Sequence, residues 1–256
     1  MTREPRYPVL LHGFTGSASS WEAPLLDGLA GAGHAPVLVD LPGHGAEIGG
    51  PDPRDFTLEA ALARIEAAGR WPADLIGYSL GGRLALHFAA AHPERVRRLV
   101  LESASPGLES EAERRERRKA DEQLASSIES NGIEWFVDHW ESLPIFAGQQ
   151  GAEGAALVRQ REHRLRNHPG SLAAALRALG PGTLPSLWDR IHRIAQPTLV
   201  VVGGLDTKFV ATAKRMASAM PRARLAVIPD AGHNVHLDAP GAWLDVVVGF
   251  LSSDVL

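Results

Sequence analysis

The sequence contains no cysteine. Disulfide bonds, thiolate-bound zinc and a cysteine nucleophile are therefore excluded, and any chemistry has to use other side chains. Without thiols, the cysteine content also gives no indication of the compartment in which the protein works.

Long apolar runs and an excess of positive charge are missing too. No stretch approaches the roughly 18 apolar residues of a membrane-spanning helix, so we expect no transmembrane segment. The formal net charge of -4 gives no electrostatic reason to bind nucleic acid or an anionic membrane. The start of the chain lacks the pattern of a secretory signal, from which we expect a cytoplasmic protein.

What the chain does have is the composition of a compact globular protein. Hydrophobic residues make up 45% of its 256 residues and charged residues 22%, which is within the ordinary range. We find no low-complexity linker and no internal repeat. A single compact unit with an insertion is therefore expected.

Short apolar runs alternate with helical patterns along most of the chain. The runs are residues 9–11, 37–39, 75–76, 99–101, 199–202 and 225–228. Between them, residues 58–65 form an amphipathic pattern after a capping Thr57, and residues 80–91 form a second helical pattern. This alternation predicts an α/β fold with a mostly parallel, doubly wound sheet.

The alternation stops between residues 105 and 188, where the pattern is helical. A charge-dense run at 109–122 is typical of a solvated helix face, and Trp135, Phe136 and Trp140 have the spacing of core residues. We therefore predict a helical cap at 105–188, inserted into a core of residues 1–104 and 189–256.

The segment Gly77-Tyr78-Ser79-Leu80-Gly81 matches the pattern G-x-S-x-G. It lies between a predicted strand and a predicted helix, as this nucleophile turn requires, and the glycines permit the sharp bend. The hydroxyl of Ser79 should project above the sheet. Backbone amides of Leu80 and of Phe14, which follows the first strand, should form an oxyanion hole.

A serine needs a histidine to take its proton and an acid to orient that histidine. His233 follows the strand at 225–228, and Asp206 follows the strand at 199–202, which gives the chain order of this fold. His236 is the alternative histidine. Glu102, which ends the strand at 99–101, is the alternative acid.

Several segments of the chain resemble one enzyme family over nearly its whole length. They are residues 39–45, 77–83, 105–108, 204–209 and 232–236, with 114–121, 164–167, Trp140, Pro144 and Phe146 in the cap. The sequence resembles the 2-succinyl-6-hydroxy-2,4-cyclohexadiene-1-carboxylate synthases of menaquinone biosynthesis, which are lyases of the α/β-hydrolase superfamily.

The resemblance implies a small-molecule tricarboxylate substrate, from which pyruvate is eliminated with Ser79 acting as a base through His233. It also implies that no metal or organic cofactor is required. The substrate-binding residues implied by the likeness are Tyr78, Arg83, Arg117, Trp140 and Arg166. Arg118 and Arg164 fit the same roles when the register of the cap shifts slightly. Arginine suits the substrate because guanidinium groups bind carboxylates in bidentate fashion.

Two other readings of the sequence remain. A serine esterase or carbon–carbon bond hydrolase of the same fold would use the same three residues and leave the cap arginines exposed or ion-paired. A ligand-binding receptor built on this fold would lack one of the three, yet Ser79, Asp206 and His233 are all present. The oligomeric state is not indicated.

Overall fold

A computed structural model describes residues 6–47, 52–143 and 154–253. Its six strands form one sheet in the order β2-β1-β3-β4-β5-β6, with parallel pairing throughout. They are β1 (Val9–Leu11), β2 (Val37–Val39), β3 (Ala73–Tyr78), β4 (Val96–Glu102), β5 (Thr198–Gly203) and β6 (Ala223–Ile228). Each predicted run lies in one of these strands, so the parallel sheet is confirmed. The strand order reverses at β1, where such folds leave a crevice at the carboxyl ends of the strands.

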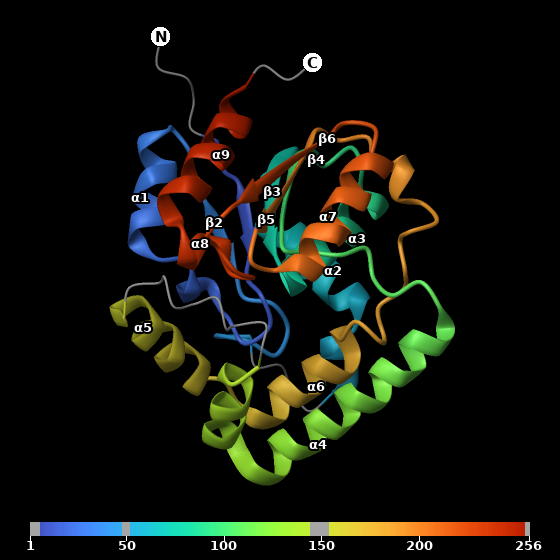
Figure 1. Ribbon diagram of the computed structural model, residues 1–256. Helices are drawn as coiled ribbons and strands as arrows, with labels where there is room; N and C mark the ends of the chain where they lie inside the picture. The colour runs from blue at the N-terminus through green and yellow to red at the C-terminus, as the bar shows by residue number, and fades with distance from the viewer. Residues whose placement is uncertain (1–5, 48–51, 144–153, 254–256) are drawn as a thin grey trace.

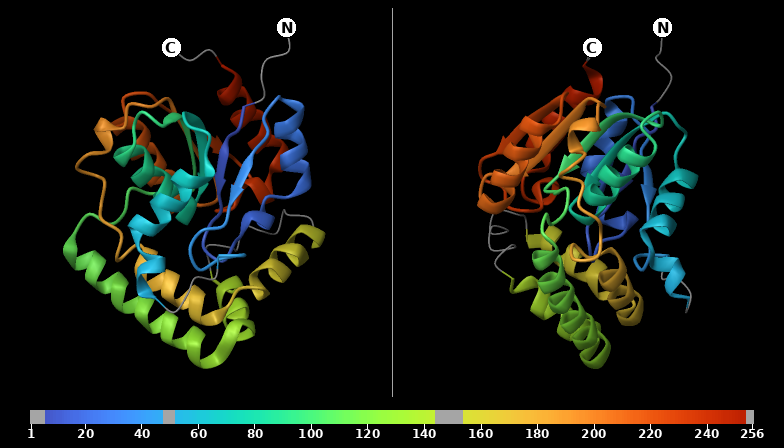
Figure 2. Two further views of the ribbon diagram at one scale, coloured as in Figure 1. Left: turned by 180° about the vertical axis from the view of Figure 1, so that it is seen from behind. Right: turned by 90° about the vertical axis from the view of Figure 1, so that its right-hand side faces the viewer.

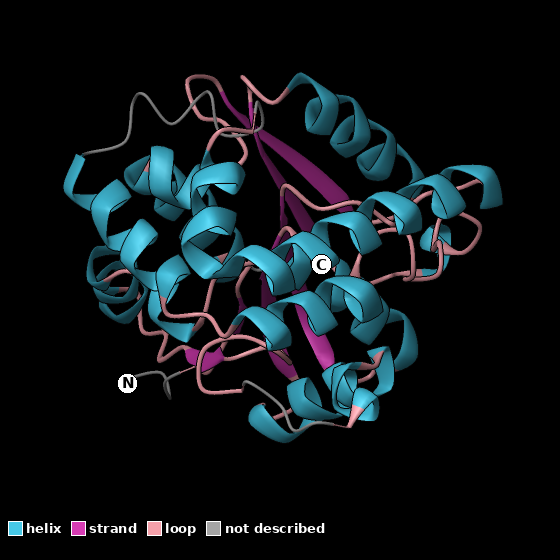
Figure 3. Cartoon of the chain, turned by 90° about the horizontal axis from the view of Figure 1, so that it is seen from below, coloured by secondary structure: helices cyan, strands magenta, loops and turns pink. Residues whose placement is uncertain are grey.

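Helices lie on both sides of the strands (Figures 1 and 3). Helices α1 and α9 cover one face, and α2, α3 and α7 cover the other. The helices are α1 (Ala23–Gly31), α2 (Leu58–Ala68), α3 (Leu80–Ala91), α4 (Glu111–Glu141), α5 (Gly154–Leu165), α6 (Pro169–Leu179), α7 (Thr207–Ala219), α8 (Val235–Asp238) and α9 (Pro240–Ser252). Short 3-10 helices are η1 (Ala18–Ser20), η2 (Pro53–Phe56) and η4 (Ile191–Arg193). The Thr57 hydroxyl accepts a hydrogen bond from the Ala60 amide at 3.2 Å, which confirms the predicted cap of α2.

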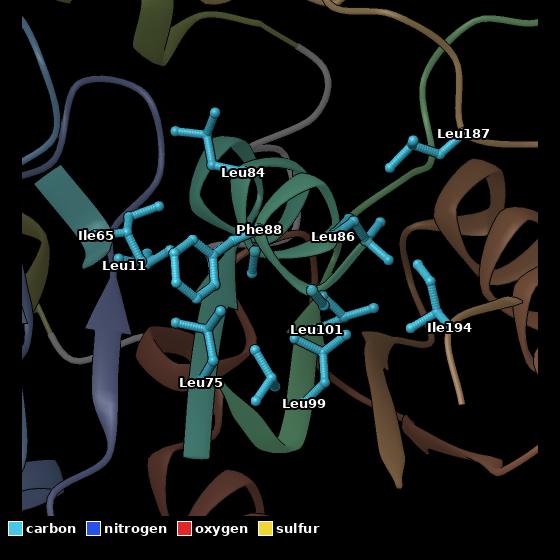
Figure 4. Packing of buried hydrophobic residues seen from close by; sticks show 14 of the residues in the cluster. Leu11, Ile65, Leu75, Leu84, Leu86, Phe88, Leu99, Leu101, Leu187 and Ile194 are labelled. Carbon is cyan, nitrogen blue, oxygen red and sulfur yellow. The ribbon is translucent and has the colours of Figure 1, made fainter. Parts of the chain in front are cut away.

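The sheet is apolar on both faces because successive side chains of a strand point to opposite sides. Leu11, Leu75 and Leu99 are fully buried against Phe88 and its neighbours on α3 (Figure 4). The residues that alternate with them, such as Ile76, pack against α1 and α9. Burial of each such side chain stabilises the fold by about 1.5–3 kcal/mol.

Helices α4, α5 and α6 lie together at one end of the molecule, away from the two termini (Figures 1 and 2). They follow β4 and precede β5, as the predicted insertion requires. We propose that residues 105–188 form the cap and that 1–104 and 189–256 form the core. Residues 144–153, which include Pro144 and Phe146, and residues 1–5, 48–51 and 254–256 lie outside the described part of the chain. None of the described helices is both long and apolar enough to cross a membrane.

The charged and aromatic residues of α4 take different positions. Most of the charge-dense run is exposed, as predicted. Phe136 is fully buried against α6, whereas Trp135 is 37% exposed and stacks on His139. The prediction that Trp135 is a core residue was therefore wrong, because its position on α4 turns it away from α6.

Candidate active site

The turn between β3 and α3 holds Ser79 in a strained conformation. Its φ of 51° lies in the left-handed region, which costs free energy for any residue other than glycine. The Ser79 amide donates a hydrogen bond to the Glu102 carbonyl at 2.9 Å. A β-carbon at Gly77 would lie 2.5 Å from the Gly81 carbonyl oxygen, so only glycine allows this turn. The predicted nucleophile turn is therefore present.

Three side chains from separate loops form one hydrogen-bonded chain. His233 Nε2 lies 3.1 Å from the Ser79 hydroxyl oxygen, and His233 Nδ1 lies 2.7 Å from an Asp206 carboxylate oxygen. The other Asp206 oxygen accepts a hydrogen bond from the Phe209 amide and caps α7. The Phe209 ring meets the His233 ring edge-on at 4.6 Å. This arrangement suits proton transfer from Ser79 to His233.

The alternative acid and the alternative histidine form a second, separate pair. Both carboxylate oxygens of Glu102 lie 2.9 Å from His236 Nδ1. Glu102 also accepts hydrogen bonds from the His236 amide and from Trp243 Nε1, and it is fully buried. Since Glu102 is engaged with His236, the geometry favours Asp206 as the partner of His233.

Ser79 opens into a pocket of about 350 Å³ between the core and the cap helices. The predicted residues that line it are Phe14, Tyr78, Ser79, Leu80, Arg83, Arg117, Trp140 and His233. The structure thus brings most of the sequence-predicted site together. Among the described residues, no three His, Asp or Glu side chains gather as metal ligands.

Arg83 and Arg117 supply positive charge to this pocket and share one carboxylate. Arg117 Nε donates a hydrogen bond to Asp121 at 2.7 Å. Burial, and secondarily the charge of Arg117, lower the pKa of Arg83 to about 10, so Arg83 remains charged at neutral pH. Burial raises the pKa of Asp121, and the neighbouring Arg117 opposes that shift.

The structure distinguishes between Arg117 and Arg118 as the predicted arginine of the pocket. Arg118 donates hydrogen bonds to Glu111 and to the Gly182 carbonyl, so Arg117 is the one that lines the pocket. Arg166 is exposed and does not line the Ser79 pocket, so its role in substrate binding stays a prediction that the geometry does not support. It lies in the turn that follows α5, where its side chain is exposed.

Arg164 lies on the inward face of α5. It is 5% exposed, donates a hydrogen bond to Glu141 at 2.9 Å and lines a smaller neighbouring pocket with Tyr78. Glu141 therefore binds an arginine of the cap. Of the two alternatives in this segment, Arg164 is the residue nearer to the site.

Sequence reasoning missed a cationic face on α7. Lys208 and Arg215 line the Ser79 pocket from the core side, together with Thr212 and Trp188. Arg215 donates hydrogen bonds to both Glu109 carboxylate oxygens and lies 3.8 Å above the Trp188 ring. The spacing of Lys208, Thr212 and Arg215 would have revealed this common face, because residues at i, i+4 and i+7 share one side of a helix.

Comparison with known proteins places the chain in a family. Residues 9–240 match the family model described as the alpha/beta hydrolase fold. A Bacillus subtilis (strain 168) protein provisionally named as a 2-succinyl-6-hydroxy-2,4-cyclohexadiene-1-carboxylate synthase is 41% identical over 96% of this chain and 90% of that protein. An Enterobacter sp. (strain 638) protein with the same name is 34% identical over 93% of this chain and 90% of its own length.

A solved structure agrees with these sequence relatives. MenH from S. aureus is 32% identical, with a TM-score of 0.90 over 98% of this chain and 94% of that chain. The chain therefore belongs to the α/β-hydrolase fold family and, within it, to the family of 2-succinyl-6-hydroxy-2,4-cyclohexadiene-1-carboxylate synthases.

Proposed function

We propose that this chain is a lyase that converts 2-succinyl-5-enolpyruvyl-6-hydroxy-3-cyclohexene-1-carboxylate into 2-succinyl-6-hydroxy-2,4-cyclohexadiene-1-carboxylate and pyruvate. The observation that carries the proposal is the similarity to synthases of this product over nearly the whole chain. A pocket that joins Ser79 to the guanidinium groups of Arg83 and Arg117 supports it.

The names of substrate and product define the bonds that change. Loss of the proton at ring carbon 2, next to the succinyl ketone, and of the enolpyruvyl oxygen at carbon 5 shifts the double bond and creates the 2,4-diene. His233 takes the Ser79 proton, and the resulting alkoxide removes the proton from carbon 2. The enolate collapses and expels enolpyruvate, which takes up the proton held by His233 and tautomerises to pyruvate. No acyl-enzyme forms.

The oxyanion hole and the cations have separate tasks in this reaction. Negative charge develops on the succinyl ketone oxygen, where the amides of Phe14 and Leu80 stabilise it. Arg83 and Arg117 bind substrate carboxylates, of which the name specifies three: one on the ring, one on the succinyl group and one on the enolpyruvyl group. Tyr78 and Trp140 line the pocket that holds the ring.

The test mixes the purified protein with the enolpyruvyl cyclohexene carboxylate and follows pyruvate release, beside Ser79→Ala and beside a p-nitrophenyl acetate assay. We expect rapid pyruvate release by the wild type and a loss of about 10³-fold or more in Ser79→Ala, as for removal of an activated serine. Ser79-dependent ester cleavage without pyruvate release would overturn the proposal and favour the esterase reading.

A further inference from the structure

We propose that Lys208, on the core side of the pocket, binds one of the substrate carboxylates and helps to determine specificity for a tricarboxylate. The inference rests on the proposed function. It adds Lys208 to the arginines that were predicted to bind substrate. Lys208 lies in the first turn of α7 and lines the same pocket as Ser79.

The position of Lys208 follows from the way α7 begins. Asp206, the partner of His233, caps the helix, and Phe209 packs against the His233 ring. These two contacts fix the first turn of α7 against the reacting centre. Lys208, between them in sequence, shares a helix face with Thr212 and Arg215, and all three line the pocket. Arg117 approaches the pocket from α4 of the cap, so cations lie on both walls.

The charge of Lys208 is available to a ligand. Arg215 is bound by both oxygens of Glu109, and Arg117 is bound by Asp121. By contrast, Lys208 is exposed, and none of the carboxylates in the described part of the chain forms an ion pair with it.

The two carboxylates that line the pocket, those of Glu109 and Glu113, bind groups other than Lys208. Glu109 holds Arg215, and Glu113 accepts hydrogen bonds from the amide and the hydroxyl of Ser110 in the capping box of α4. Neither neutralises Lys208. A substrate carboxylate that enters the pocket would therefore find this ammonium group without a competing anion among the described residues.

Fold stability does not explain a lysine at this position. The amino end of a helix carries partial positive charge, so a cation in the first turn is unfavourable and an anion is preferred. Lys208 occupies the second position after the Asp206 cap. A cation that opposes the helix dipole and faces a pocket is better explained by an anionic ligand than by stability.

Lys208 also completes the set of cations that the substrate needs. Three carboxylates were expected to meet three arginines, yet Arg166 is exposed and lies outside the pocket. Arg164 is bound to Glu141 in the neighbouring pocket. The Ser79 pocket also holds Arg215, but both oxygens of Glu109 bind it. Lys208 therefore joins Arg83 and Arg117 as a third cation that can meet a substrate carboxylate.

The experiment compares Lys208→Gln with Lys208→Arg and with Lys214→Gln. Lys214 is an exposed lysine of the same helix that does not line the pocket, so its variant controls for the loss of one charge on α7. For Lys208→Gln we expect KM to rise about tenfold, the effect of losing one charge-assisted hydrogen bond, with kcat within about twofold. Lys208→Arg should retain most of the affinity, and Lys214→Gln should match the wild type. An unchanged KM in Lys208→Gln, or a loss confined to kcat, would overturn the inference.

A second measurement does not depend on the lyase reaction. A fluorophosphonate modifies an activated serine, and benzene-1,3,5-tricarboxylate in the pocket should protect Ser79 from it. We expect protection of Lys208→Gln to need about tenfold more tricarboxylate than protection of the wild type or Lys214→Gln. If the wild type releases no pyruvate, the proposed function is wrong. The protection assay still tests whether Lys208 binds a tricarboxylate in the pocket. Equal protection of all variants, or no protection of any, would overturn the inference.

Discussion

At the scale of single residues, Asp206 makes two contacts that substitutions can separate. One oxygen caps α7 at the Phe209 amide, and the other lies 2.7 Å from His233 Nδ1. Asparagine caps helices about as well as aspartate, but it cannot stabilise a positively charged imidazole. We therefore expect Asp206→Asn to lower kcat for pyruvate release by about 10³–10⁴-fold, with little change in the thermal unfolding midpoint.

Asp206→Ala is the matched variant, since it removes the cap as well as the charge. It should lose as much activity as Asp206→Asn and in addition about 1 kcal/mol of folding free energy. Circular dichroism melts and the pyruvate assay on both variants measure the two effects. Equal unfolding midpoints would argue against the cap, and a near-normal kcat in Asp206→Asn would argue against the orienting role.

At the scale of elements, two glycines inside helices should respond to alanine in opposite ways. Gly132 interrupts α4 with φ 83° and ψ -177°, a conformation restricted to glycine, and redirects the chain so that Trp140 meets Phe14 at 5.4 Å. An added β-carbon there would meet only a Glu134 oxygen at 3.8 Å, so the cost of Gly132→Ala is conformational. We expect a loss of about 1–3 kcal/mol in urea unfolding.

Gly249 lies within α9, and an added β-carbon would meet nothing within 4 Å. Gly249→Ala should therefore stabilise the protein by about 0.5–1 kcal/mol, because alanine loses less backbone entropy on folding. Shifts of the same sign in the two variants would contradict this account of the kink in α4.

The elements also show which parts of the site local sequence dictates. The turn at Ser79 and the loops that carry Asp206 and His233 follow from apolar runs and glycine positions that act within a few residues. The inward face of α5 and the pocket face of α7 depend on packing between distant segments. For that reason local sequence does not reveal that Lys208 lines the Ser79 pocket or that Arg166 lies outside it.

At the scale of the whole molecule, three buried histidines connect stability to pH. Burial lowers the pKa of His12 to about 4, of His44 to about 3 and of His87 to about 4. His12 is held neutral, because its Nε2 accepts a hydrogen bond from the Leu41 amide while its Nδ1 donates to the Gly13 carbonyl. Protonation of these rings is therefore coupled to unfolding.

The lowered pKa values of the histidines make the folded protein less stable as the pH falls. Each histidine has a lower pKa when folded than its ordinary value of 6.5, so its stabilisation is complete above that pH and is lost as the pH falls toward 4. Asp238 opposes this trend, because burial raises its pKa from 3.8 to about 6. Its contribution to the stability of the folded protein therefore increases as the pH falls from about 6 toward 4. Asp121, whose pKa burial also raises, acts like Asp238. His34 and His163, whose pKa burial lowers, act like the three rings. The histidines therefore outnumber the carboxylates.

We therefore expect the free energy of unfolding to decrease as the pH is lowered from about 6.5 to 4.5. Near pH 4.5, unfolding should be accompanied by a net uptake of about two protons. Urea unfolding at pH 7.5, 6.0 and 5.0 measures this slope. His87→Gln, which cannot be protonated, should reduce the slope by up to about 1.4 kcal/mol per pH unit, because one coupled proton is removed. An unfolding free energy that is the same at pH 7.5 and 5.0 would show that the buried rings find compensating anions as they charge, and the variant would then leave the flat profile unchanged.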